Sequence, residues 1–231
     1  MEKTAVDLKK EQLSSLSRPR HPYSLAARFF FLSMDVLTGR PTTLPKMKLL
    51  EMLASIPYRA WEIREYGSLT RNYGRPDVVH EARRIVAWGR DAQDNEYWHL
   101  LAVQEKMKAE GLPDPWYLSQ PVALTIVWSY RIISWLLAFV SLQRAFLFNA
   151  EFEDHAEHVY AEFVRDHPEW ETEPVRSSLA TEYSRNAATW ADVFRRIGLD
   201  ERDHRNRSFA CGGKPEYVVR YEGMPETDDK S

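Results

Sequence analysis

Apolar residues along this chain recur with helical spacing almost throughout, and the alternation typical of β-strands is hard to find. The first long helix is predicted to begin after Thr42 and Thr43, either of which could cap it, and Pro57 within it predicts a kink. Pro76 is well placed to start the second helix, and Gly111 follows its end. We expect helices over about 44–64, about 76–110, two over about 121–166 and one over about 182–210. The pattern predicts an all-α fold.

Outside this helical region, both ends of the chain are polar. We expect a partly helical N-terminal arm over 1–40, a helical bundle over 41–211 and a polar tail over 212–231. A length of 231 residues suits one domain, or at most two. The first residues carry mixed charge and match neither a secretory signal nor a transit peptide.

Charge and composition exclude several classes of protein. Lys and Arg total 31 against 34 Asp and Glu, and the formal net charge of −3 argues against a general nucleic-acid binder. Cys211 is the only cysteine, which excludes an internal disulfide framework and a Cys-rich zinc or iron–sulfur site. Neither glycine-rich phosphate-binding motif occurs. A helical protein that binds a metal or a surface fits these limits.

The segment 121–140 has the length of a membrane span, about 20 residues, and is strongly apolar. Arg131 lies at its centre, where a charge within the hydrocarbon costs at least about 2.5 kcal/mol. The negative mean hydropathy of the chain also argues against several spans. A buried core helix and a helix on a membrane surface are therefore better interpretations than a true span. Trp128 and Trp135 suit a helix face in the bilayer interface.

Two Glu-x-x-His pairs stand out, Glu96 with His99 and Glu201 with His204. A carboxylate and an imidazole at i, i+3 share one helix face, so both can bind the same metal. Each pair lies on an apolar stripe, where a charged group must be paired or metal-bound because burial of a bare charge is expensive. Further acidic candidates on other helices are Glu51, in LLEMLASIP, and Glu153 or Glu157, in NAEFEDHAEHVYAEF.

Together these residues give the order Glu, Glu-x-x-His, Glu, Glu-x-x-His on four helices, which is the ligand set of a di-iron carboxylate bundle. Hard carboxylates with one imidazole per metal favour iron or manganese over zinc or copper. Any one glutamate of this set is more often a solvated helix residue, so the joint order carries the interpretation. The remaining histidines have ordinary surface or loop interpretations.

Four motifs of the chain resemble those of the alternative oxidases, including the related plastid terminal oxidases. LLEMLASIP is similar to the family's Leu-Glu-Thr-Val-Ala-x-Val-Pro and matches Glu51 to its first ligand. DNEYWHLL is similar to Glu-Asn-Glu-Arg-Met-His-Leu and matches Glu96 and His99. LDERDHR is similar to Ala-Asp-Glu-x-x-His-Arg and matches Glu201 and His204.

The fourth motif, FEDHAEHVY, is similar to Leu-Glu-Glu-Glu-Ala-x-His-x-Tyr. This match selects Glu153 over Glu151 and Glu157 as the ligand on that helix. It also matches His158, and it places Tyr160 on the family's tyrosine beside the metals. The resemblance covers about residues 40–210.

The resemblance implies a ferritin-like four-helix bundle with two iron ions bound in its core. It implies a homodimer that lies monotopically on a membrane, oxidises a quinol and reduces dioxygen to water without pumping protons. Tyr160 is expected to supply an electron and a proton, and Asn95 and Asp200 are expected to orient the ligands. The short N-terminal stretch favours the cytoplasmic face of a bacterial inner membrane, with an organellar inner membrane as the alternative.

The expected quinol pocket departs from the family pattern. Lys46 stands where the family has Arg, Asp154 belongs to an altered acidic triplet, and Val159 replaces a small hydroxyl residue; Leu50 completes the residues expected there. Because all six ligands are kept, dioxygen chemistry is better supported than quinol as the reductant. Three alternatives remain: a di-iron oxygenase or hydroxylase acting on a quinone precursor or another small molecule, a ferritin-like iron-storage protein, and a non-enzymatic helical bundle.

Overall fold

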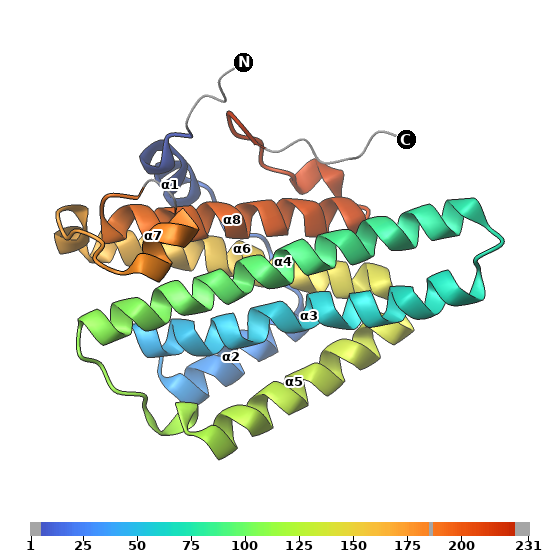
Figure 1. Ribbon diagram of the computed structural model, residues 1–231, viewed down its shortest axis with the longest axis horizontal. Coiled ribbons are helices and arrows are strands. Elements are labelled where there is room, and N and C mark those ends of the chain that lie inside the picture. The colour runs from blue at the N-terminus through green and yellow to red at the C-terminus, as the bar shows by residue number, and fades with distance from the viewer. Residues whose placement is uncertain (1–5, 185–186, 225–231) are drawn as a thin grey trace. The chain divides into compact units, whose positions relative to one another are not determined.

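The computed structural model describes residues 6–184 and 187–224, and this described chain is all-α, as predicted (Figure 1). The helices are α1 (Leu8–Ser17), α2 (Leu25–Thr38), α3 (Leu44–Arg71), α4 (Pro76–Ala109), α5 (Gln120–Val140), α6 (Leu142–Asp166), α7 (Ser178–Ser184) and α8 (Trp190–Cys211). Short 3-10 helices are η1 (Trp116–Leu118), η2 (Pro168–Glu171) and η3 (Pro215–Tyr217). Within the described ranges there is no β-strand, and Pro174 and Thr189 form an isolated bridge. The ferritin-like arrangement stays a prediction.

The ends of the first two long helices follow the signals in the sequence. Thr43 is the residue that caps α3, and its side chain accepts a hydrogen bond from the backbone N–H of Lys46 (3.3 Å). α3 continues through Pro57 and ends later than predicted, at Arg71. α4 begins at Pro76, and Gly111 follows its end with a φ of 67°, a conformation that favours glycine.

The prediction of a single helix over 182–210 is wrong. α7 ends at Ser184, and α8 begins at Trp190. Thr189 caps α8, because its hydroxyl accepts the backbone N–H of Asp192 (3.3 Å). A threonine followed three residues later by an acidic residue resembles a capping box, so the start of α8 was readable in the sequence.

Contacts in the chain are densest within two compact units. The central unit comprises Ser33–Ala145, and the terminal unit comprises Met1–Leu32 together with Phe146–Ser231. The dividing positions fall within α2 and α6. The division into arm, bundle and tail that the sequence suggests stays a prediction.

The central unit is built on α3 and α4, which lie side by side, with α5 packed against α3 (Figure 1). α3 and α4 approach closely at Gly89, where a Cβ atom would lie 3.1 Å from the carbonyl oxygen of Tyr58. The buried rings of Tyr58, Trp61 and Trp88 form an aromatic cluster beside this contact. Close helix packing and apolar burial therefore hold the centre of this unit together.

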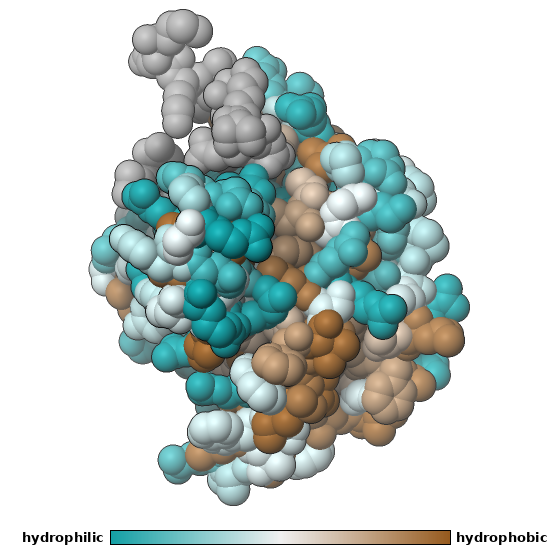
Figure 2. Space-filling view, turned by 90° about the vertical axis from the view of Figure 1, so that its right-hand side faces the viewer, coloured by the Kyte–Doolittle hydropathy of each residue, from teal (hydrophilic) through white to brown (hydrophobic). Residues whose placement is uncertain are grey.

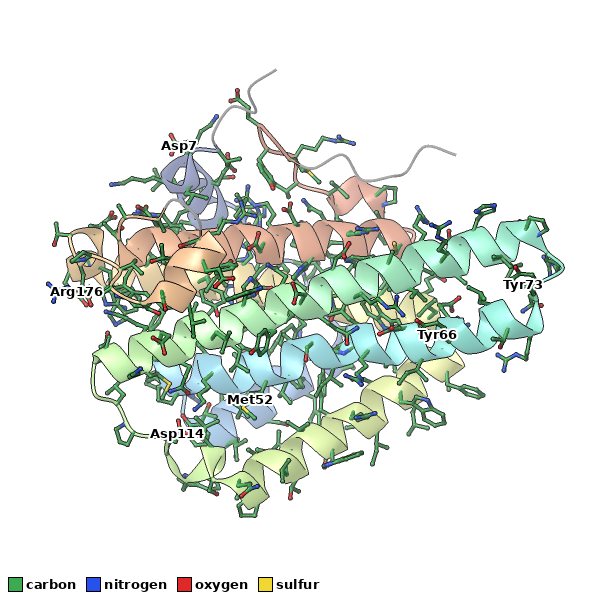
Figure 3. All side chains as sticks on the ribbon, in the orientation of Figure 1. Asp7, Met52, Tyr66, Tyr73, Asp114 and Arg176 are labelled. Carbon is green, nitrogen blue, oxygen red and sulfur yellow. The ribbon has the colours of Figure 1, made fainter. Side chains whose placement is uncertain are left out.

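Some polar contacts of the central unit lie at its surface, and Figure 3 labels Tyr66 and Asp114, which take part in two of them. The guanidinium of Arg90 lies 5.4 Å from the centre of the Tyr66 ring and joins α4 to α3. Near the other end of α3, the ammonium of Lys48 donates to both carboxylate oxygens of Asp114, at 2.7 and 2.9 Å. Contacts of this exposed kind add little stability, about 0–1 kcal/mol each.

The terminal unit combines α1 with α6 and α8, so residues from both ends of the chain pack together. α1 packs against α8, and Glu11 and Ser15 of α1 are buried. From the start of α2, the Phe30 ring makes edge contacts with Phe148 and Phe152 of α6. This unit buries more charged side chains than the central unit, which also buries several.

α5 is long and apolar enough to cross a membrane, although core helices of soluble proteins can meet the same criterion. Only 22% of its most apolar window is buried. Figure 2 shows hydrophobic side chains gathered in its lower part, at the height of α5 in Figure 1. The exposed large apolar residues of α5 are Leu124, Trp128, Ile132, Ile133, Trp135, Leu136, Phe139 and Val140. Exposed apolar faces of this kind are typical of surfaces that bind a membrane or a partner.

Candidate metal centre

The central unit brings three of the predicted ligands together, Glu51 on α3 and Glu96 and His99 on α4; we call them the α3–α4 ligand set. Nδ1 of His99 lies 3.2 Å from Oε2 of Glu96 and 3.5 Å from Oε2 of Glu51. All three residues are buried, and Glu96 and His99 have no exposed surface. Two carboxylates and one imidazole therefore meet inside the α3–α4 pair.

The helical register of α4 explains why Glu96 and His99 point inward. Ile85, Trp88 and Ala92 precede them on the same apolar stripe, and all three are buried. Packing of this stripe against α3 carries the two polar side chains into the interior. The contact between the imidazole and the carboxylate shows that the two side chains share one face of α4, and their binding of a metal stays a prediction.

The terminal unit brings together the other three predicted ligands, Glu153 on α6 and Glu201 and His204 on α8; we call them the α6–α8 ligand set. Each offers a ligand atom within 4.8 Å of those of the other two. Nδ1 of His204 lies 3.7 Å from Oε2 of Glu201. Glu153 and Glu201 are almost completely buried, and His204 is 8% exposed.

Asn149 holds Glu153 in place, and the sequence analysis did not identify it. The side-chain amide of Asn149 donates to Oε1 of Glu153 (2.9 Å) and also contacts the hydroxyl of Ser208 (3.2 Å). Asn149 lies one helical turn before Glu153, a spacing at which amide and carboxylate side chains interact on a helix. That spacing is a signal which could have found it, because such partners orient metal ligands.

The structure separates Glu153 from its acidic neighbours on α6. Glu151 accepts hydrogen bonds from the backbone N–H (3.1 Å) and the hydroxyl (2.6 Å) of Ser24. Glu157 accepts from Nε of Arg202 (2.7 Å) and forms an ion pair with Arg18 (2.5 Å). Both carboxylates thus have partners outside the α6–α8 ligand set, and the selection of Glu153 as the ligand stays a prediction.

Asp154, expected in the quinol pocket, is a buried partner of Arg205. Nε of Arg205 donates to Oδ1 of Asp154 (2.7 Å), and the backbone N–H of His21 (2.9 Å) and the hydroxyl of Tyr23 (3.0 Å) donate to Oδ2. Burial by itself would raise the pKa of Asp154, but the His21 hydrogen bond and the Arg205 charge outweigh it and lower that pKa. The carboxylate therefore stays charged in a buried network.

His158 was given an ordinary surface or loop interpretation from composition alone, and it is in fact buried. Its Nδ1 lies 2.7 Å from the carbonyl oxygen of Asp154, and its Nε2 lies 3.1 Å from that of Arg18. Asp154, Glu157 and His158 also form a compact group of donor atoms. Because arginines already bind both carboxylates of this group, we interpret it as an ion-pair network.

The residues expected to assist the chemistry are placed as follows. Tyr160 is buried on α6, and its ring stacks on Phe194 of α8, with ring centres 6.1 Å apart. Asp200, one residue before Glu201, accepts a hydrogen bond from the hydroxyl of Tyr183 (2.6 Å) and pairs with Arg196. Asn95 lies half-buried on α4, directly before Glu96. Their catalytic roles stay predictions.

Of the other residues expected in the quinol pocket, Lys46 has the most distinct environment. Its ammonium is buried and donates to the Asp35 carboxylate (2.6 Å) and to the carbonyl oxygen of Gly39 (2.9 Å). Leu50 is half-buried on α3, and Val159 is buried on α6. The ion pair with Asp35 accounts for the burial of Lys46.

Each ligand set fits a metal ion by the chemistry of its donors. Carboxylate oxygens and an imidazole nitrogen lie close enough together in each set to bind one ion. Two hard carboxylates per imidazole favour iron or manganese. Burial of the ligands also limits competition from water. Both sets could therefore hold a metal.

Comparisons with known proteins add no support to this interpretation, which therefore rests on the residues described above. No protein-family model matches the chain, and no curated protein matches it with significant similarity.

Proposed function

We propose that the protein is a non-haem di-iron oxidase in which each of the two ligand sets holds an iron ion. The observation that carries the proposal is the duplicated donor set, two buried glutamates with one buried histidine in each compact unit. A chance cluster of helix-surface carboxylates would be solvated, whereas these are not. Bound iron would supply the redox chemistry that activates dioxygen.

The proposed reaction is oxidation of a quinol with reduction of dioxygen to water. Two quinols supply the four electrons and four protons that convert one dioxygen into two waters, leaving two quinones. The choice of a quinol rests on the resemblance of the four motifs to the alternative oxidases. Within the chain, Tyr160 is proposed to transfer an electron and a proton, since its buried phenol lies on the same helix as Glu153.

A position on a membrane surface is part of the proposal, because a long-chain quinol is dissolved in lipid. The exposed apolar face of α5 supports it. A helix lying in the interface keeps Arg131 at the level of the headgroups, whereas a spanning helix would place it at the centre of the hydrocarbon. We propose a monotopic homodimer with α5 in the interface.

The first test measures iron content together with oxygen consumption driven by a short-chain ubiquinol. We expect two irons per chain and quinol-dependent uptake in the natural protein. Glu201→Ala removes a carboxylate of the α6–α8 set, so iron loading and uptake should be lost. Glu216→Ala, at an exposed glutamate paired only with Lys214, is the matched control and should change neither.

The outcome also separates the alternatives. Full iron content and full activity in Glu201→Ala would show that the α6–α8 ligand set does not bind the iron. With labelled dioxygen, label found only in water supports an oxidase, whereas label in the organic product identifies an oxygenase or hydroxylase. Iron uptake that proceeds without any organic substrate would indicate iron storage.

A further inference from the structure

A cavity of about 320 Å³ lies in the central unit and is lined by α3, α4 and α5. Most of its wall is apolar, with Ile63 from α3 and Trp128 and Trp135 from α5 among the lining residues. None of the six predicted metal ligands lines it. Its volume lies in the range of small-molecule sites, about 300–1,000 Å³. The proposed oxidase chemistry does not use this space.

Two arginines give the cavity its charge, Arg59 from α3 and Arg131 from α5. Both side chains are exposed, and no acidic residue of the described chain lines the cavity with them. The guanidinium of Arg131 lies 5.1 Å from the centre of the Trp128 ring, a contact that orients the charge without neutralising it. A complementary occupant would combine an anionic group with an apolar body.

The acidic residue closest in sequence to Arg59 is already bonded elsewhere. Glu62 accepts hydrogen bonds from Nε of Arg90 (2.8 Å) and from the amide of Gln93 (3.1 Å). Gln93, which closes the α4 side of the cavity, also donates to the carbonyl oxygen of Gly89 (2.9 Å). These bonds fix the polar end of the cavity wall, and Glu62 does not line the cavity, although the charge of Arg59 contributes to the lowered pKa of Glu62.

The cavity lies beside the exposed apolar face of α5. Trp128, Ile132 and Trp135 line it and are also among the exposed apolar residues of that helix. Tryptophans prefer the headgroup level of a bilayer, and arginines extend toward phosphates from apolar surroundings. A lipid at this surface would therefore meet an apolar wall and two cations together.

We propose that the cavity binds one anionic phospholipid, with its phosphate at Arg59 and Arg131 and an acyl chain along the wall between α3 and α5. Basic pockets between apolar helices bind anionic lipid headgroups by this combination of contacts. The proposal depends on the membrane-surface part of the proposed function and is independent of iron.

The test uses the purified full-length protein with iron content measured in parallel. We expect the protein to bind phosphatidylcholine vesicles more tightly when they contain phosphatidylglycerol. Each of Arg59→Gln and Arg131→Gln should weaken binding to the mixed vesicles about fivefold, the effect of one basic residue near an anionic surface. Arg75→Gln makes the same charge change at an exposed arginine outside the cavity and should have a much smaller effect.

A second variant tests the cavity separately from its charge. Ile63→Trp adds bulk to the wall at a position that is 46% exposed, so the fold should tolerate it. Native mass spectrometry should show one phosphatidylglycerol retained by the natural protein and lost in Ile63→Trp. Binding to the vesicle surface through α5 should survive in this variant.

Three results would overturn the proposal: equal effects of Arg59→Gln and Arg75→Gln, a retained lipid in Ile63→Trp, or inorganic phosphate competing as well as phosphatidylglycerol. Competition by inorganic phosphate would identify the cavity as a site for a soluble anion. Normal iron content in every variant keeps this outcome distinct from failure of the di-iron proposal.

Discussion

The α6–α8 ligand set lies among buried ion pairs, whereas the α3–α4 set lies in a core of apolar and aromatic side chains. Around Glu153, the arginines Arg202 and Arg205 bind the carboxylates of Glu157 and Asp154. In the central unit, the core next to the ligands consists of rings and small residues, as at the contact of Gly89 with α3. The same three donors, two carboxylates and one imidazole, are thus held in two different environments.

This difference shows how one helix can bury several acidic side chains while only one of them is left as the proposed metal ligand. On α6, serine and arginine side chains bind the acidic side chains next to Glu153. These contacts leave Glu153 as the proposed metal ligand of the helix. On α4, no such selection is needed, because Glu96 is the only acidic residue buried in the helix. Stability in the terminal unit should therefore depend on charges, and stability in the central unit on packing.

The largest effect is expected from removing a charge in the terminal unit. Arg202 binds Glu157, the side chain and carbonyl oxygen of Glu11, and the Ser15 hydroxyl, all in buried surroundings. Arg202→Met should lower the free energy of unfolding by about 3–5 kcal/mol, because it leaves the buried Glu11 carboxylate without its cation and leaves Glu157 with Arg18 alone as its cation. Urea unfolding of the iron-free protein measures the change.

Arg165→Met is the matched control for this substitution. Arg165 pairs with Asp166 at an exposed position on the same unit. Loss of this ion pair should lower the free energy of unfolding by less than about 1 kcal/mol. Similar losses in the two variants would contradict the view that burial of charge distinguishes the terminal unit.

A smaller loss is expected from crowding the close contact in the central unit. Gly89→Ala would place a Cβ atom 3.1 Å from the backbone oxygen of Tyr58, which cannot move without shifting α3. We expect the free energy of unfolding to fall by about 1 kcal/mol, because the cost of overpacking exceeds the gain in helix propensity. Gly67→Ala, where the nearest atoms belong to the flexible Arg71 side chain at 3.5 Å, should instead stabilise the protein. Thermal unfolding of both variants tests whether packing controls this unit.

The smallest effect concerns an ion pair on the surface of the central unit. Burial would raise the pKa of Glu62, but hydrogen bonds from Arg90 and Gln93 outweigh it and lower that pKa below the ordinary 4.5. A lowered pKa in the folded state stabilises the protein above pH 4.5, and the gain is lost as the pH falls through the folded pKa. Glu62→Gln should therefore cost less than about 1 kcal/mol at neutral pH and still less in acid. An unchanged difference across this range would show that the charge of Glu62 is unimportant.

The helices were largely predictable, because apolar periodicity and capping residues act locally. Thr43 and Pro76 marked helix starts that the structure confirms. The break before α8 was missed although Thr189 provided a local signal. The closeness of Glu96 to His99 and of Glu201 to His204 was also predictable, since the i, i+3 spacing fixes which side chains share a helix face.

What the sequence did not reveal depends on contacts between distant positions. The pairing of Glu11 with Arg202 and the bond from the His21 backbone to Asp154 join residues far apart in the chain. Local pattern carries no information about such pairs, so His158 was assigned to the surface and α1 to an arm. The cavity beside α5 was equally hidden, because its wall is shared by three helices.

The division of the chain between the two units has a consequence for the order of assembly during synthesis. Residues 33–145 contain the whole α3–α4 ligand set, so it can form while the ribosome is still translating α6. The α6–α8 set needs Glu201 and His204, and Glu11 of α1 must wait for a partner 191 positions later. On the proposed function, a nascent chain would therefore be able to bind its first metal at Glu51, Glu96 and His99 before α8 has been synthesised.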